Sequence, residues 1–173
     1  GCRDLDDNHL LTHADKQVLN GMLENAVELA AKIGGQRQVE TVLSHGDFQP
    51  ANILVNESGN WLIDWEFAAR RQYMYDILVY ALSSRFPSGL ADRIDRFVKY
   101  PELAVGEIVR GSDINDWPRS EEDRQLSLVL FLMEEFCQAL QEISNPVFSQ
   151  LSPGFSNKIE EYRNGLFLIT RAG

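Results

Sequence analysis

The sequence has few features that would indicate a secreted or membrane protein. Its two cysteines, Cys2 and Cys137, are too few for a disulfide framework, which favours a reducing compartment. No segment reaches the roughly 18 consecutive apolar residues that a membrane-spanning helix needs. The longest apolar run, residues 126–133, is interrupted by Ser127. No signal-peptide pattern opens the chain. We therefore expect a cytoplasmic protein without a transmembrane segment.

Basic residues are in the minority, with 16 Lys and Arg against 26 Asp and Glu, so the formal net charge is −10. A surface of this sign repels polyanions and disfavours nucleic-acid binding. It suits a cationic small molecule, although many ordinary soluble proteins are equally acidic. The 44% hydrophobic content and the length of 173 residues are enough to bury the core of one soluble domain.

The most informative stretch of the chain lies between residues 45 and 64. Two short apolar runs, residues 53–55 and 61–63, flank a polar segment that contains glycine, residues 56–60. Two strands joined by a five-residue loop with glycine form a recognised hairpin pattern. The sequence therefore predicts a short β-hairpin directly after a polar loop.

The register of this hairpin decides which side chains meet. If Val55 pairs with Trp61, then Asn52 stands opposite Asp64, and directly opposed residues point to the same face of a sheet. Mg²⁺ prefers oxygen ligands and takes only one or two of them from the protein. Asn52 and Asp64 are thus predicted to hold Mg²⁺, and Asp47 in the preceding loop could accept a proton from a hydroxyl that attacks a phosphate.

These residues resemble the catalytic centre of a known family. The segment 45–47 (His-Gly-Asp), Asn52 five residues after Asp47, and the later Asp64 are similar to the catalytic loop and metal-binding aspartate of the aminoglycoside phosphotransferase and choline kinase-like family. The resemblance covers residues 42–82. It implies a protein kinase-like fold, ATP as the nucleotide co-substrate and Mg²⁺ as the cofactor.

Two departures separate this chain from the protein kinases, which carry a related H-R-D-x-x-x-x-N and D-F-G pair. Gly46 stands where those enzymes have arginine, and residues 65–66 (Trp-Glu) follow the metal aspartate. Both departures favour small-molecule kinases. Gln49 occupies the place of the protein-kinase catalytic-loop lysine, so any contact that it makes with phosphate would be uncharged. Glu66 is a second candidate for contact with phosphate or substrate.

The resemblance also implies the roles of the site residues. Asp47 would be the catalytic base, while Asn52 and Asp64 would hold magnesium. His45 would brace the catalytic loop. Asp76 would support the same loop from the start of a helix, either as the N-cap of that helix or as a brace.

Kinases of this type also have an amino-terminal nucleotide lobe with a glycine-rich turn and a strand lysine. Residues 1–40 contain neither pattern, and Lys16 and Lys32 both fall on one predicted helix. We therefore interpret residues 1–173 as a single carboxy-terminal lobe, α+β and mainly α-helical, in which the hairpin carries the metal site. Whether the other lobe was truncated, cleaved or never present stays open.

Apolar periodicity and capping residues predict the helices. A first helix is expected over residues 15–33, ended by glycines, and further helices over residues 75–84 and 90–99. A short helix is expected at 102–109, and a long one at 120–143 with a Ser-x-x-Asp cap.

Several charged and aromatic residues are predicted to be ordinary structural features. We expect Glu134 and Glu135 to lie on a solvated helix face and the pair Arg70 and Arg71 to lie in a solvated loop. Trp65 is expected to pack in the core.

The sequence thus predicts a kinase lobe that transfers the γ-phosphate of ATP or GTP to a hydroxyl of an amine-bearing sugar, an amino alcohol or a related small molecule. The chain alone should be poorly active. The alternative is a noncatalytic binding module that forms a homodimer through the face of the missing lobe. A hydrolase that uses His45 and Asp47 is disfavoured, because His9 and His13 show no metal-ligand spacing.

Overall fold

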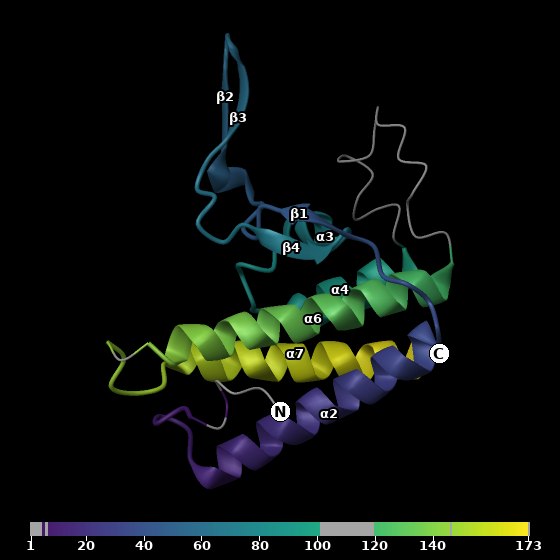
Figure 1. Cartoon of the computed structure of the whole chain (residues 1–173), viewed down its shortest axis with the longest axis vertical. Coiled ribbons are helices and arrows are strands. Elements are labelled where there is room, and N and C mark those ends of the chain that lie inside the picture. Colours follow the sequence, from purple (N-terminus) through teal and green to yellow (C-terminus); the bar gives the residue numbers. More distant parts are fainter. Residues whose placement is uncertain (1–4, 6, 101–119, 146, 173) are drawn as a thin grey trace.

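Helices build most of the molecule, and the predicted α+β, mainly helical class is confirmed (Figure 1). The computed structural model describes residues 5, 7–100, 120–145 and 147–172. The long helix α6 (Glu121–Ile143) packs against α2 (His13–Gly34) and α7 (Pro153–Ala172), and α4 (Leu90–Lys99) lies along α7. Among the described residues, no helix combines the length and the apolar character needed to cross a bilayer.

Helix α6 is central because it buries a wide apolar face. Four residues within two turns, Leu128, Val129, Phe131 and Leu132, are all at most 1% exposed. This face contacts α2, α4 and α7 at once, so α6 forms the middle of the core. It begins as the sequence predicts, since the hydroxyl of Ser120 accepts a hydrogen bond from the backbone N–H of Asp123 at 3.0 Å.

The first long helix, α2, also confirms its prediction. The hydroxyl of Thr12 accepts a hydrogen bond from the backbone N–H of Asp15 at 3.1 Å, and the Asp15 carboxylate accepts one from the backbone N–H of Thr12 at 2.9 Å. This reciprocal pair satisfies two N–H groups that the first turn leaves unpaired. At the other end, Gly35 adopts a positive φ of 55° and ends the helix.

Helix α7 was not predicted from the sequence. Its buried residues Phe155, Tyr162 and Ile169 alternate with the partly buried Ile159 and Leu166, so one apolar face at helical spacing packs on the core. Gly165 allows α7 to approach α4 closely, because a Cβ at this position would lie 2.6 Å from Cδ1 of Ile94.

The other predicted helices differ in length or cannot be compared. Helix α4 has the expected bounds, whereas α3 (Tyr75–Ala81) is shorter than predicted. The short helix expected at 102–109 lies outside the described residues.

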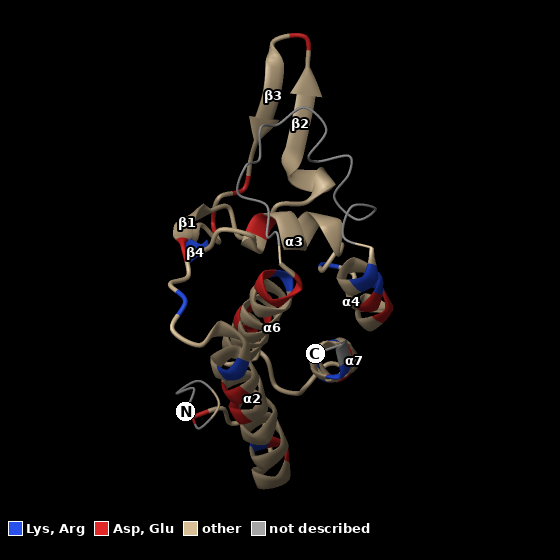
Figure 2. Cartoon of the chain, turned by 90° about the vertical axis from the view of Figure 1, so that its right-hand side faces the viewer, with Lys and Arg blue, Asp and Glu red and all other residues tan. Residues whose placement is uncertain are grey.

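Four strands form two separate antiparallel ribbons. Strand β1 (Thr41–Ser44) pairs with β4 (Ala69–Gln72), and β2 (Ile53–Asn56) pairs with β3 (Gly59–Leu62). The β2–β3 hairpin projects away from the helices, whereas β1 and β4 lie beside α3 (Figures 1 and 2). The loop that carries the predicted site residues therefore leaves β1 and returns through the hairpin to β4.

The predicted hairpin is present, but its predicted register is wrong. Trp61 pairs with Leu54 rather than with Val55, and the connecting turn has two residues, 57–58, instead of five. The side chain of Asn56 causes the difference, because its oxygen accepts a hydrogen bond from the backbone N–H of Ser58 at 2.9 Å and closes the turn early.

The new register changes the neighbour of Asn52. The backbone N–H of Ile63 donates to the carbonyl oxygen of Asn52 at 3.0 Å, so Asp64 lies one residue beyond the position opposite Asn52. Asp64 itself adopts a left-handed backbone conformation with a φ of 66°. The two predicted metal ligands therefore do not face each other across a regular strand pair.

Candidate active site

Asp47 lies in the loop between β1 and the short 3-10 helix η1 (Pro50–Asn52), and three side chains hold its carboxylate. Its Oδ1 accepts a hydrogen bond from Nε of Arg85 at 2.5 Å. Its Oδ2 accepts from Nε2 of Gln49 and from Nδ2 of Asn52, both at 2.8 Å. Donors on both oxygens leave this carboxylate one favoured orientation.

These hydrogen bonds keep Asp47 ionised. Partial burial alone would raise the pKa of Asp47, but the hydrogen bonds from Arg85, Gln49 and Asn52, together with the charge of Arg85, hold that pKa below its ordinary value. At neutral pH the group is therefore a carboxylate. It can accept a hydrogen bond from a substrate hydroxyl, and it has little tendency to take the proton before the hydroxyl oxygen begins to bond elsewhere.

Asp76 holds the backbone of the loop just before Asp47. Its two carboxylate oxygens accept hydrogen bonds from the backbone N–H groups of His45, at 2.7 Å, and Gly46, at 2.9 Å. Met74, not Asp76, is the N-cap of α3. Of the two roles considered for Asp76, the structure therefore places it as a brace of the loop.

His45 joins the loop to the end of the hairpin. Its Nδ1 accepts a hydrogen bond from the backbone N–H of Asp47 at 3.2 Å, and its Nε2 lies 2.7 Å from the carbonyl oxygen of Ile63. A carbonyl oxygen can only accept, so Nε2 is the nitrogen that donates to Ile63. His45 thus fixes the distance between Asp47 and the residue that precedes Asp64.

Gly46 is required at its position. Its φ is +85°, and a Cβ there would lie 2.3 Å from the carbonyl oxygen of Phe67. This close approach explains why the arginine of protein kinases has no place in this loop.

Replacement of Gly46 by alanine is expected to lower the free energy of unfolding by at least about 1–3 kcal/mol, the usual cost of a left-handed non-glycine residue, because a clash is added to that strain. Urea unfolding measures the change. Gly21→Ala is the matched control, since no atom lies within 4 Å of a Cβ at Gly21, and helix interiors favour alanine. Equal unfolding midpoints for Gly46→Ala and the unchanged protein would contradict the assigned contact.

Asn52 and Asp64, the predicted metal ligands, differ in how firmly they are held. Nδ2 of Asn52 donates to the carbonyl oxygen of Asp47 at 2.9 Å as well as to its carboxylate, which turns the other amide atom, Oδ1, away from Asp47. Asp64 is exposed, and within the described part of the chain no hydrogen bond or ion pair engages its carboxylate. The structure joins Asp64 to the loop only through the backbone of Ile63.

This donor set suits Mg²⁺ in the presence of phosphate. An amide oxygen and a carboxylate are the hard ligands that Mg²⁺ accepts, and it completes its shell with water or phosphate oxygens. The residues that the structure describes contain no group of three or more His, Cys, Asp or Glu side chains able to hold a metal ion. A site made of protein groups alone is therefore not formed here, and bound phosphate would have to supply further ligands.

The two candidates for phosphate or substrate contact differ in their surroundings. Gln49 is half-buried and donates its amide to Asp47, so it serves the carboxylate rather than pointing into solvent. Glu66 is exposed in the turn after Asp64. Of the predicted site residues, the structure thus brings Asp47, Asn52 and Gln49 into direct side-chain contact.

Sequence reasoning missed Arg85 and misjudged Glu135. Nη1 of Arg85 donates to both carboxylate oxygens of Glu135, at 3.0 and 2.8 Å, and Glu135 is only 1% exposed. The expected solvated position of Glu135 is therefore wrong. Position 135 lies one turn after the buried Phe131 and adjacent to the buried Phe136, so helical periodicity could have placed it inside. No local pattern could have paired it with Arg85, which is 50 residues away.

The expected exposure of Arg71 is also wrong, since its side chain is 6% exposed, whereas Glu134, at 34%, lies at the edge of the solvated face. Nε of Arg71 lies 2.6 Å from Oε1 of Glu134, and Nη1 donates to the carbonyl oxygen of Phe67 at 2.7 Å. Burial raises the pKa of Glu134, and the nearby Arg71 offsets only part of this effect. The pair fastens β4 to α6 beneath the loop, whereas Arg70 is exposed as expected.

Trp65 does not pack in the core as predicted. It is 48% exposed, donates its indole N–H to the carbonyl oxygen of Leu62 at 2.9 Å, and packs its ring 4.7 Å from that of His45. Its position directly after Asp64 leaves an aromatic face beside the site.

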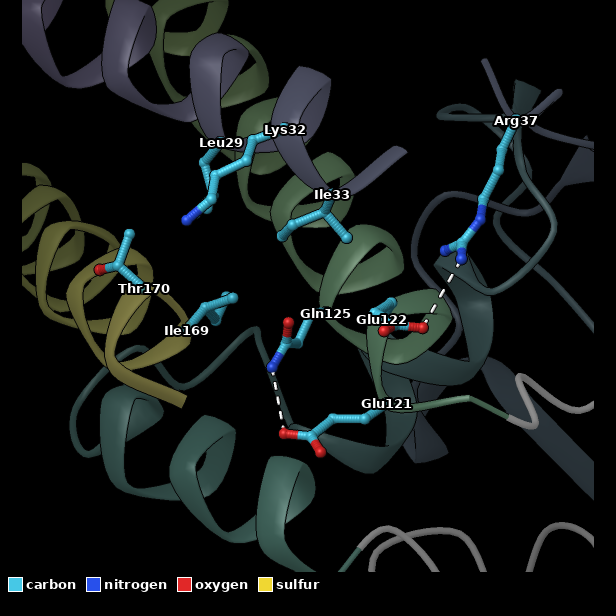
Figure 3. Close-up of a pocket in the computed structure, with 9 residues that line it drawn as sticks. All are labelled: Leu29, Lys32, Ile33, Arg37, Glu121, Glu122, Gln125, Ile169 and Thr170. Carbon is cyan, nitrogen blue, oxygen red and sulfur yellow. Dashed lines mark hydrogen bonds and ion pairs between the residues drawn. The ribbon is translucent and has the colours of Figure 1, made fainter. Parts of the chain in front are cut away.

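A separate hollow of about 450 Å³ lies between α2, α6 and α7 (Figure 3). Four of its polar residues form two pairs: Gln125 donates to Glu121 at 3.2 Å, and Arg37 lies 3.6 Å from Glu122. No residue of the loop around Asp47 lines this hollow.

Comparison with protein-family models supports the resemblance seen in the sequence. The model of the Phosphotransferase enzyme family (APH) matches residues 3–124. The chain belongs to this family. No curated protein matches the chain. The matched region includes the whole loop, the hairpin and Arg85, whereas Glu135 and α7 of this phosphotransferase-family chain lie after it.

Proposed function

We propose that this chain carries the catalytic carboxylate and the metal ligands of an ATP-dependent small-molecule kinase. The observation that carries the proposal is the ionised carboxylate of Asp47, held by three donors next to Asn52. An acceptor hydroxyl would donate a hydrogen bond to Asp47, which orients the oxygen toward the γ-phosphorus. Because phosphoryl transfer passes through a loose transition state, the proton can move to Asp47 late.

Asn52 and Asp64 are the residues that would hold Mg²⁺. The ion supplies charge neutralisation on the transferred phosphoryl group when it is bound with nucleotide. Asn52 can present only Oδ1, because its Nδ2 is committed to Asp47. His45 links the backbone next to Asp64 to the backbone of Asp47, so the base and this metal ligand are tied to the same loop.

We propose an acceptor with an amine or quaternary ammonium group, such as an aminoglycoside-like sugar or an amino alcohol. The exposed carboxylate of Glu66 and the half-exposed ring of Trp65 both lie in the segment after Asp64. A cation over an aromatic face gains about 0.5–2 kcal/mol, depending on how far it is desolvated. The net charge of −10 acts in the same direction.

The nucleotide clamp would come from outside these 173 residues, which hold no glycine-rich turn or strand lysine ahead of His45. Leu54 and Trp61 lie opposite each other on one face of the projecting hairpin and are 49% and 55% exposed, and Val55, on the other face, is 74% exposed. Exposed apolar side chains on a projecting hairpin favour a surface that another folded unit covers. We therefore expect this polypeptide alone to bind MgATP weakly and to transfer phosphate poorly.

The same exposed hairpin favours a second candidate function, a noncatalytic binding module. In that case a second copy of the chain would cover Leu54, Val55 and Trp61. Sedimentation of the chain, followed by calorimetry with MgATP, separates the two functions. A stable dimer that takes up no MgATP would support the binding module, whereas MgATP uptake by a monomer would support the kinase.

The proposed kinase function is tested with the whole gene product. ADP release is followed with MgATP in the presence of separate acceptors: kanamycin, glucosamine, choline and ethanolamine. We expect one amine-bearing acceptor to stimulate ADP release and to appear as a phosphate monoester by ³¹P NMR. ADP release that is the same with and without every amine-bearing alcohol would contradict the proposed acceptor class.

A further inference from the structure

We propose that Arg85 is a positioning residue, which fixes the carboxylate of Asp47 for the acceptor hydroxyl, and that Glu135 on α6 fixes Arg85 in turn. This inference rests on the proposed function, since it assumes that Asp47 is the base. It adds a charged chain of contacts from the helical core to the reacting group.

Arg85 contacts both the side chain and the backbone of the catalytic loop. Its Nε donates to Oδ1 of Asp47 at 2.5 Å, and its Nη2 donates to the carbonyl oxygen of Gly46, also at 2.5 Å. The other oxygen of Asp47 is held only by the neutral amides of Gln49 and Asn52. Loss of Arg85 would therefore free Oδ1, and the carboxylate could rotate about its own bond.

Glu135 keeps Arg85 from moving. Both of its oxygens accept from Nη1 of Arg85, and the hydroxyls of Tyr75 and Tyr162 donate to the same carboxylate. Burial, followed by the charge of Glu135, raises the pKa of both phenols, so they remain protonated donors. Because α3, α6 and α7 each contribute one of these three residues, the anchor belongs to the rigid part of the fold.

The donor count shows what Arg85 does not do. A guanidinium has five N–H donors in a fixed fork. The contacts to Asp47, Gly46 and Glu135 engage all three nitrogens of the group. Because each nitrogen already donates to the protein and the side chain is only 21% exposed, the geometry assigns Arg85 to holding Asp47 rather than to binding the nucleotide.

The first test titrates the ¹³Cγ signal of Asp47 by NMR in the 173-residue chain. In the unchanged chain the midpoint should lie below the ordinary aspartate value of about 3.9. Loss of an adjacent cation should raise the midpoint of Arg85→Gln by about 1 unit or more. Arg85→Lys should give an intermediate value, because one ammonium cannot replace the planar fork. Arg163→Gln, which alters an exposed arginine on α7, should leave the midpoint unchanged.

Arg85→Gln leaves Glu135 buried without its counter-charge, so that variant could unfold. The double variant Arg85→Gln/Glu135→Gln removes both charges and keeps the volume, and it should show the same raised midpoint. A midpoint within about 0.3 units of the unchanged chain, in whichever of these two variants folds, would overturn the positioning role, since a nearby opposite charge ordinarily shifts a carboxyl by one unit or more.

The second test is kinetic and uses the whole gene product with the acceptor that stimulates ADP release. Arg85→Gln should lower kcat by about 10²-fold with little change in KM, as expected when a reacting group is misplaced by about 1 Å. An unchanged kcat would overturn the inference. A separate variant tests the proposed function. Turnover retained in Asp47→Asn would show that Asp47 is not the base. That result would leave the titration of Asp47 in the Arg85 variants unchanged, so the two proposals fail independently.

Discussion

Replacement of Asp47 by asparagine is expected to lower kcat of the whole gene product by about 10²–10⁴-fold, the range that a positioned general base contributes. Asparagine keeps the size of the side chain and an oxygen that can accept from Arg85, but its NH2 group cannot accept the hydrogen bonds that Gln49 and Asn52 donate, and it cannot take the proton. The measurement is steady-state ADP release in the presence of the stimulating acceptor, with circular dichroism to confirm folding.

Asp95→Asn is the control for this change. Asp95 lies on α4 and forms only a local ion pair with Lys99 at 2.7 Å, far along the chain from the loop. Its replacement should leave kcat unaltered. If Asp47→Asn turned over as fast as Asp95→Asn, Asp47 could not be the base, whatever its hydrogen bonds.

The second large effect is expected from Glu135→Ala, which should lower the free energy of unfolding by about 3–5 kcal/mol. The change removes the carboxylate that faces Arg85 at 2.8 Å and leaves a largely buried guanidinium without its main counter-charge. It also leaves the hydroxyls of Tyr75 and Tyr162 without an acceptor. Urea unfolding followed by tryptophan fluorescence measures the loss.

Glu142→Ala is the matched control on the same helix. Glu142 is more than half exposed and lies 3.7 Å from Lys158, a surface pair of the kind that contributes about 0–1 kcal/mol. A loss below about 1 kcal/mol for Glu135→Ala, similar to that of Glu142→Ala, would show that the Arg85–Glu135 pair does not carry the stability that its burial implies.

The helices with strong local signals could be predicted from the sequence. Thr12 and Ser120 mark the starts of α2 and α6, and the apolar periodicity of both helices is continuous. Helix α7 was missed although its sequence carries both signals: Ser152 caps its first turn, and apolar residues recur at helical spacing, namely Phe155, Ile159, Tyr162, Leu166 and Ile169. The apolar pattern could not predict the register of the hairpin, because the register depends on the side chain of Asn56, which closes the turn.

The site shows the same division between local and distant contacts. Asp47, Gln49 and Asn52 are within six residues of one another, so a family-like spacing was enough to bring them together. Arg85 and Glu135 meet only through the packing of α6, and no spacing in the sequence encodes a contact across 50 residues. The position of Glu135 on its helix therefore predicted a solvated side chain, whereas its pairing with Arg85 places it in the interior.

The most direct test of the account is paramagnetic line broadening by Mn²⁺·ATP in the ¹⁵N-labelled chain. Because broadening by Mn²⁺ reports even weak binding, the chain can be studied without a nucleotide lobe. We predict that the amide signals of Asp47, Asn52 and Asp64 broaden first, and that Asn52→Ala/Asp64→Asn removes the effect. Broadening centred instead on the exposed acidic turn at residues 121–123, and unaffected by that double variant, would contradict a metal–nucleotide site at the catalytic loop.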